Sequence, residues 1–135
     1  MLRLEKSTRV LLMDDEESIR QMADAFLRRI GLEPVLVADG AAAVREFTMA
    51  QHQGKPFELL ILDLTIPVGL GGREAMELIR KLDPHVPAIV SSGYSSDPVL
   101  GNFEEYGFQA IVPKPYELAQ LSRVIHRVLV RREEA

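Results

Sequence analysis

The sequence has no cysteine, few aromatic residues and no long apolar segment. Without cysteine, it cannot form a disulfide framework, a thiol nucleophile or a thiolate metal site. Aromatic residues make up 6% of the chain, too sparse a set for a base-stacking platform. Apolar runs such as 59–62 fall far short of the ~20 residues that a membrane span requires. Residues 1–6 show no signal-peptide pattern, so we expect a cytoplasmic location without membrane contact.

The net charge and the amino-acid composition further limit the class of protein that this sequence can encode. The formal net charge is −4, which argues against a nucleic-acid partner, because binding a phosphate backbone requires a basic surface. A cluster of arginines lies near the C-terminus, at Arg123, Arg127, Arg131 and Arg132. We interpret this cluster as the solvated face of a last helix. With 47% hydrophobic and 27% charged residues over 135 positions, the chain has the composition of one globular domain.

Short apolar runs alternate with longer amphipathic ones along the whole chain. Each run predicts a buried strand, and each segment that follows has apolar residues at helical spacing. The predicted strands are 8–13, 33–38, 57–62, 87–91 and 109–112. The predicted helices lie at about 19–30, 40–53, 75–82, 97–106 and 118–128, the second of them capped by Asp39 and the fourth weak and polar.

Five strand–helix units in succession predict one α/β domain. Parallel strands need crossover connections, and these are right-handed. The expected closure is a doubly wound, flavodoxin-like (βα)5 fold with a parallel five-stranded sheet in the order 2-1-3-4-5. We expect residues 8–130 to form this domain, with 1–7 as an N-terminal extension and 131–135 as a C-terminal tail.

Polar residues stand where four of these strands end. Asp14 and Asp15 follow the first strand, Asp63 the third, Ser91 the fourth and Lys114 the fifth. The carboxyl ends of adjacent parallel strands meet at one edge of a sheet, where open α/β sheets bind ligands. Three neighbouring carboxylates suit a hard divalent cation, Mg²⁺ or Mn²⁺. A carboxylate nucleophile, this cation, a lysine and a hydroxyl together predict a phosphoryl-transfer site.

Four sequence blocks lie at the ends of the predicted strands: Met13-Asp14-Asp15-Glu16, Leu62-Asp63-Leu64-Thr65-Ile66-Pro67, Val90-Ser91-Ser92-Gly93 and Lys114-Pro115-Tyr116. These blocks closely resemble the signatures of response-regulator receiver domains, the CheY-like phosphoacceptor modules of two-component signalling. They occur in the family's order and spacing, and the resemblance covers about residues 8 to 130.

The resemblance implies a role for each site residue. Asp63 would accept a phosphoryl group from the phosphohistidine of a histidine kinase or a histidine phosphotransfer domain. Asp15, Asp63 and the backbone carbonyl of Thr65 would bind the metal directly, with Asp14 acting through water. Ser91 and Lys114 would contact the phosphoryl group, and the Lys114–Pro115 peptide would be cis. Such a domain is no enzyme by itself, since it catalyses only its own phosphorylation and dephosphorylation.

The chain departs from the common receiver pattern in two places. The loop 67–74 is one residue longer, and the switch position three residues before Lys114 holds Ile111 instead of an aromatic residue. With 91–95 and 105–108, these features resemble C-terminal receivers of hybrid sensor histidine kinases, which implies an attached kinase core. Because an aliphatic residue cannot make the aromatic swing, we expect 92–97 and the fourth helix to carry the conformational change.

Three alternatives stay open on the residues alone. A haloacid-dehalogenase-type phosphatase also uses an aspartyl nucleophile, but it needs Asp-x-Asp after the first strand, where this chain has adjacent aspartates. A flavin-binding domain of the same topology needs a loop rich in glycine and hydroxyl groups where this chain has residues 14–17, all acidic. A docking module that no longer accepts phosphate would have lost part of the pocket, and all the pocket residues are present.

Overall fold

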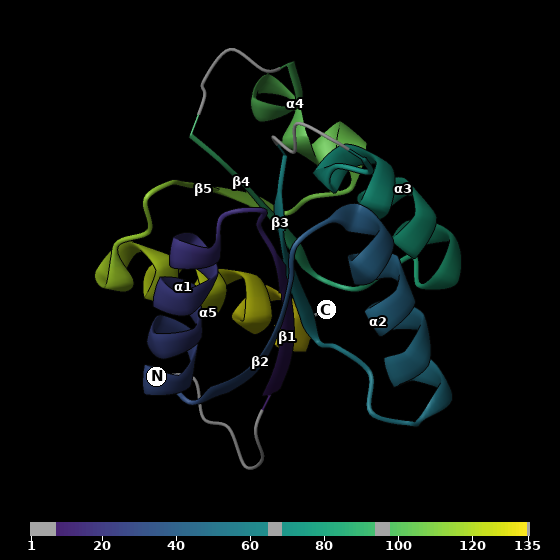
Figure 1. Cartoon of the computed structure of the whole chain (residues 1–135), viewed down its shortest axis with the longest axis horizontal. Coiled ribbons are helices and arrows are strands. Elements are labelled where there is room, and N and C mark those ends of the chain that lie inside the picture. The colour runs from purple at the N-terminus through teal and green to yellow at the C-terminus, as the bar shows by residue number, and fades with distance from the viewer. Residues whose placement is uncertain (1–7, 65–68, 94–97, 135) are drawn as a thin grey trace.

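The computed structural model describes residues 8–64, 69–93 and 98–134, in which a parallel sheet lies between helices (Figure 1). The strands are β1 (Thr8–Met13), β2 (Leu32–Val37), β3 (Leu59–Asp63), β4 (Ala88–Ser92) and β5 (Ala110–Pro113). The helices are α1 (Glu17–Arg29), α2 (Gly40–His52), α3 (Gly72–Leu82), α4 (Pro98–Gly101), the 3₁₀ helix η1 (Phe103–Tyr106) and α5 (Leu118–Glu134).

The sheet has the predicted topology. Its order is β2-β1-β3-β4-β5, and every neighbouring pair of strands is parallel. The doubly wound α/β prediction is therefore confirmed. Buried Pro34 lies in β2, an edge strand, where a residue without an N–H group interrupts no interior hydrogen-bond ladder.

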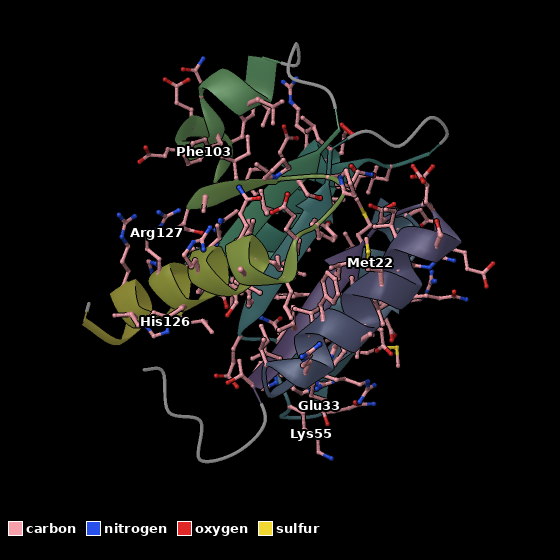
Figure 2. The ribbon with its side chains drawn as sticks, turned by 90° about the vertical axis from the view of Figure 1, so that its left-hand side faces the viewer. Met22, Glu33, Lys55, Phe103, His126 and Arg127 are labelled. Carbon is pink, nitrogen blue, oxygen red and sulfur yellow. The ribbon has the colours of Figure 1, made fainter. Side chains whose placement is uncertain are left out.

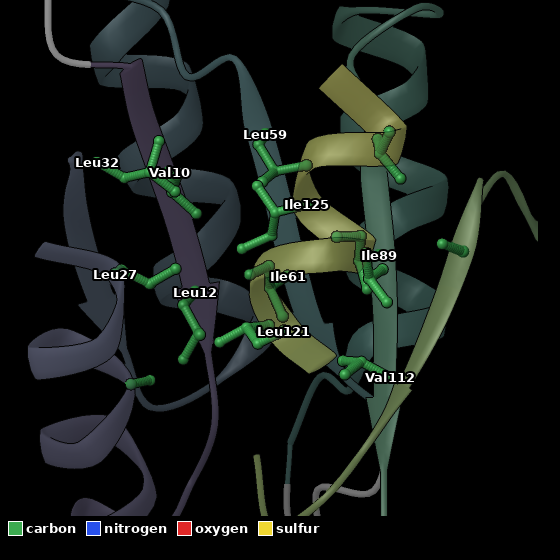
Figure 3. Close-up of a cluster of buried hydrophobic side chains, with 14 of the residues drawn as sticks. Val10, Leu12, Leu27, Leu32, Leu59, Ile61, Ile89, Val112, Leu121 and Ile125 are labelled. Carbon is green, nitrogen blue, oxygen red and sulfur yellow. The ribbon is translucent and has the colours of Figure 1, made fainter. Parts of the chain in front are cut away.

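Two hydrophobic clusters cover the two faces of the sheet, because side chains along each strand alternate between faces. From β3, Leu59 and Ile61 pack toward α1 and α5, while Leu60 and Leu62 pack toward α2 and α3. Figure 3 shows the first cluster, in which Leu121 and Ile125 of α5 lie over strand residues. These four side chains of β3 are fully buried, which explains why the strand is apolar up to its last residue, Asp63.

Local signals fix the helix ends close to their predicted places. Asp39 caps α2, since its Oδ1 accepts the Ala42 N–H at 2.8 Å. Gly31 follows the end of α1 with φ 92°, a left-handed conformation that favours glycine. On α5, Arg123, Arg127 and Arg131 are exposed, as the solvated-face interpretation expected, and Figure 2 shows this helix on the same side of the sheet as α1.

Two glycines, Gly72 and Gly40, permit close backbone contacts at the two ends of the β3–α3 connection. A Cβ on Gly72, the first residue of α3, would lie 2.5 Å from the carbonyl oxygen of Asp63. A Cβ on Gly40 would lie 2.6 Å from the carbonyl oxygen of Leu70, which accepts the Gly40 N–H at 2.8 Å. The start of α3 can therefore pack directly against the end of β3, where a residue with a side chain would clash.

The prediction of one helix over 97–106 was wrong. The described part consists of the single turn α4 and the 3₁₀ helix η1, separated at Asn102, whose φ is −136°. Gly101 and Asn102 are poor helix formers, and both are exposed, so packing does not compensate. Helix α5 continues past residue 130, the predicted domain boundary, to Glu134, while the predicted extension 1–7 lies outside the described residues.

Over the described ranges, we find no helix whose length and apolar character would let it cross a membrane.

Candidate functional site

The carboxyl edge of the sheet brings the predicted acidic residues together with the predicted lysine. Asp14 follows β1 directly, and Asp63 is the last residue of the adjacent strand β3. Both carboxylate side chains are fully buried. Lys114 follows β5, and its ammonium group reaches the two carboxylates across the end of β4. The convergence that the strand-end argument predicted is present for these three residues.

Lys114 is a bridge between two buried acids. Its Nζ donates to Asp14 Oδ2 at 2.9 Å and to Asp63 Oδ2 at 3.1 Å, and its side chain is 11% exposed. Burial alone would lower the pKa of Lys114, but its hydrogen bonds to Asp14 and Asp63 outweigh burial and raise the pKa above its ordinary value. The lysine therefore remains charged at neutral pH. The Lys114–Pro115 peptide is cis, as the resemblance implied.

A second group of acids lies at the mouth of the same site. One carboxylate oxygen from each of Asp14, Asp15 and Glu16 lies within 4.8 Å of the other two, and the last two residues are exposed. Asp14 is held in place, because its Oδ1 accepts the Glu16 N–H at 2.9 Å and its carbonyl oxygen accepts from Arg20 Nη1 at 2.9 Å. An oxygen-rich set with one fixed and two solvent-facing carboxylates fits a hard divalent ion such as Mg²⁺.

Ser91 of β4 is the strand neighbour of Asp63, and its hydroxyl group has a hydrogen-bond partner. Ser91 pairs in register with Asp63, and both side chains are fully buried. The Tyr116 hydroxyl donates to Ser91 Oγ at 2.9 Å. Burial raises the pKa of the Tyr116 phenol far above its ordinary value, so the phenol keeps its proton and can donate.

The remaining predicted residues divide into two groups. The first group lies outside the described residues. It comprises Thr65, which was predicted to offer its carbonyl to the metal, and residues 94–97 of the loop 92–97. Ile111 is described, and it is partly buried on the face that α2 and α3 cover. There it packs against the same cluster as Phe103 and Tyr106 of η1.

Sequence reasoning missed three residues that shape the site. Glu16 joins the acidic group, and its position directly after Asp14-Asp15 could have shown this. Arg20 fixes the backbone of Asp14 from one turn into α1, a role that no local pattern reveals. Tyr116 belongs to a recognised block, yet its bond to Ser91 joins residues 25 positions apart and becomes visible only in the folded chain.

Comparison with protein sequences agrees with this geometry. The family model for the response regulator receiver domain matches residues 10–126. The sensory transduction protein RegX3 of Mycobacterium tuberculosis (strain ATCC 25618 / H37Rv) is 35% identical over 126 residues, which cover 92% of this chain and 52% of that protein. The yeast transcription factor SKN7 (Saccharomyces cerevisiae) is 28% identical over 93% of this chain and 19% of its own length. This chain thus spans about half, or less, of these relatives.

Comparison with solved structures gives the same result. One match is the receiver domain of the sensor histidine kinase PA1611 from Pseudomonas aeruginosa PAO1, a structure with a magnesium ion coordinated in the active-site cleft. The TM-score is 0.78 and the identity is 27%, and the match covers 90% of this chain and 97% of that one. The Vibrio cholerae chemotaxis protein CheY4 matches with a TM-score of 0.78 and 27% identity, covering 90% and 98%. None of these matches favours the aspartyl phosphatase alternative. The chain belongs to the response regulator receiver domain family of two-component systems.

Proposed function

We propose that this receiver domain accepts a phosphoryl group on Asp63 from a phosphohistidine, with Mg²⁺ or Mn²⁺ as cofactor, and passes the change to a partner or an attached domain. The observation that carries the proposal is the Lys114 bridge. A charged lysine lies within hydrogen-bond distance of two fully buried carboxylates at the ligand-binding edge of a doubly wound sheet. Such a grouping of buried charge is typical of a functional site.

The chemistry needs one nucleophile and groups that receive negative charge. An Asp63 carboxylate oxygen would attack phosphorus, and the bond from phosphorus to the imidazole nitrogen would break, leaving its electron pair on the imidazole. Lys114 and the hydroxyl of Ser91 would then contact the new phosphoryl oxygens. A bound divalent ion, held by Asp14, Asp15, Asp63 and the Thr65 carbonyl, would neutralise phosphoryl charge. The acidic group of Asp14, Asp15 and Glu16 supports the part of this assignment that involves Asp14 and Asp15.

Phosphorylation of the isolated chain tests the proposal. With a small phosphodonor such as acetyl phosphate and Mg²⁺, the protein should gain one phosphoryl group, observed by intact-protein mass spectrometry. The adduct should be lost on treatment with hydroxylamine, because an acyl phosphate reacts with this nucleophile and a phosphate ester does not. A protein that gains no phosphoryl group, or only a hydroxylamine-stable one, would contradict the proposal.

Metal binding should stabilise the domain measurably. The folded state gathers carboxylates that are dispersed in the unfolded chain, so Mg²⁺ should bind the folded state selectively. At ten times its dissociation constant the ion contributes about 1.4 kcal/mol, a rise of a few degrees in Tm. Asp15→Asn should remove most of this rise, whereas Asp39→Asn, at the cap of α2, should keep it. Thermal melts of the wild type and the two variants, with and without millimolar Mg²⁺, measure these shifts in Tm. If Mg²⁺ leaves the Tm of the wild type unchanged, the proposed metal site is excluded.

The conformational response must pass through this chain without an aromatic residue at position 111. Ile111 packs in one cluster with Phe103 and Tyr106 of η1. Because Ile111 of β5 is aliphatic and cannot make the aromatic swing, we propose that the response lies in the β4–α4 connection, α4 and η1, with β5 contributing little. The short, weakly helical α4–η1 segment supports this choice, because a segment with few regular hydrogen bonds is less costly to rearrange.

The same proposal includes the phosphodonor of the domain and its cellular location. The phosphodonor would be a histidine kinase or a histidine phosphotransfer domain in the cytoplasm, with neither nucleic acid nor membrane in contact with this domain. One context is the receiver of a hybrid kinase with an attached kinase core. The likeness to the receiver of the sensor histidine kinase PA1611 supports that context.

A further inference from the structure

Arg20, one turn into α1, holds the segment that carries the acidic group. Its Nη1 donates to the carbonyl oxygen of Asp14 at 2.9 Å, and its backbone N–H donates to the carbonyl oxygen of Glu16 at 3.0 Å. The Asp14 carbonyl belongs to the peptide unit that joins Asp14 to Asp15, and a peptide unit is planar and stiff. The Arg20 side chain therefore restrains the plane from which both aspartates extend.

The carboxylate of Asp15 depends on this backbone for its position. Asp15 is exposed, and its side chain makes no hydrogen bond or ion pair within the part of the chain that the structure describes. Asp14, by contrast, is held at both carboxylate oxygens, Oδ1 by the Glu16 N–H and Oδ2 by Lys114. The direction of the Asp15 carboxylate is therefore set by its own side-chain torsions and by the peptide that Arg20 holds.

The Arg20 guanidinium bonds a backbone carbonyl, although residues 14–17 are all acidic. Over residues 8–64, 69–93 and 98–134, it forms no ion pair with a carboxylate. An arginine paired with Asp15 or Glu16 would occupy oxygen atoms that could otherwise bind a cation. The observed contact instead leaves one oxygen each from Asp14, Asp15 and Glu16 gathered within 4.8 Å. Arg20 thus organises this acidic group without neutralising it.

We propose that Arg20 is a positioning residue for the metal, which raises the affinity of the acidic group for Mg²⁺ by holding the Asp14–Asp15 peptide. This inference rests on the metal site of the proposed function. Arg20 acts through the backbone and is no ligand itself, because a guanidinium has no acceptor atom to offer.

The positive charge of Arg20 has the opposite effect, since it repels a cation bound to the neighbouring acids. Arg20 is half-buried, and a charge that stays in contact with water changes a binding constant by about fivefold at most. Removing a partner that orients a metal ligand lowers metal affinity by roughly 10- to 100-fold. Positioning should therefore outweigh repulsion, and the loss of Arg20 should weaken Mg²⁺ binding.

Mg²⁺ titrations of the whole chain, followed by backbone amide chemical shifts, separate the two effects. Arg20→Met should raise the dissociation constant about tenfold. Arg20→Lys keeps the charge, but its ammonium nitrogen lies one bond short of the position of Nη1. This variant should therefore bind Mg²⁺ at least as weakly as Arg20→Met. Arg29→Met, which removes an exposed charge from the last turn of the same helix, is the matched control and should bind as the wild type does.

The outcomes also separate this inference from the proposed function. If Arg20→Met binds Mg²⁺ as tightly as the wild type or more tightly, the inference is overturned while the metal site stands. A lower Tm of metal-free Arg20→Met with an unchanged dissociation constant would mean that Arg20 supports only the start of α1. If Arg20→Met does not fold, wild-type affinity in Arg20→Lys overturns the inference. A wild-type chain that binds no Mg²⁺ overturns the proposed metal site, and the inference with it.

Discussion

Asp63→Asn should abolish phosphorylation of the chain and leave its folding free energy almost unchanged. The amide is isosteric with the carboxylate, yet its oxygen is a far weaker nucleophile, so no acyl phosphate can form. Two electrostatic effects then oppose each other. The variant loses the attraction between Lys114 and Asp63, and it also loses the repulsion between Asp63 and Asp14. Each amounts to a few kcal/mol at an effective dielectric constant of about 20. We expect a net change within about 1 kcal/mol.

Mass spectrometry after incubation with acetyl phosphate, together with urea unfolding, measures both quantities on the same sample. Asp39→Asn is the matched control. It makes the same chemical change at the cap of α2, where asparagine serves almost as well, so this variant should be phosphorylated as wild type is. A hydroxylamine-labile phosphoryl group on Asp63→Asn would place the acceptor on another residue. Loss of folding in the variant would show that Asp63 is needed mainly for structure.

Most of the fold follows from patterns that are local in the sequence. β1 was predicted with its observed bounds, Thr8–Met13, because its apolar run ends abruptly at two aspartates. The bounds of β3 were less accurate. Phe57 is buried like a strand residue, but its ring stacks on Phe47, with the centroids 6.5 Å apart, and it lies before the first residue of the strand. Apolar character marks burial, and burial does not require membership of a hydrogen-bonded ladder.

The site was predictable as far as topology determines it. Asp14, Asp63 and Lys114 meet because the carboxyl ends of adjacent parallel strands must lie at one edge. Individual hydrogen bonds do not follow from this rule. The bonds that Tyr116 makes with Ser91 and Lys114 makes with Asp14 join residues 25 and 100 positions apart. They depend on side-chain directions that only the packed core fixes, and no periodicity in the sequence encodes them.

Lys114→Met should destabilise the domain by about 3 kcal/mol near neutral pH, the typical cost of removing one partner from a buried ion pair. Methionine keeps much of the side-chain volume, so the loss is mainly electrostatic. Asp14 and Asp63 would remain fully buried and opposed, with no cation between them. Lys81→Met, on the exposed face of α3, makes the same substitution and should change stability by no more than about 0.5 kcal/mol. Urea unfolding of the two variants at matched pH measures the difference.

The pH dependence distinguishes this electrostatic cause from a packing defect. In the wild type the pKa of Lys114 is raised above 10.5, so its stabilising contribution is complete below that pH and is lost only as the pH rises through the higher folded value. In Lys114→Met the repelling carboxylates favour proton uptake in the folded state. The folded chain then binds more protons than the unfolded chain, so the stability of the variant should rise as pH falls from 7 toward 5. Mg²⁺ should restore part of the loss at neutral pH by supplying positive charge to the same acids. A deficit that is constant between these pH values and indifferent to Mg²⁺ would mean that the lysine stabilises the domain through packing, and the charge bridge on which the proposed site rests would lose its support.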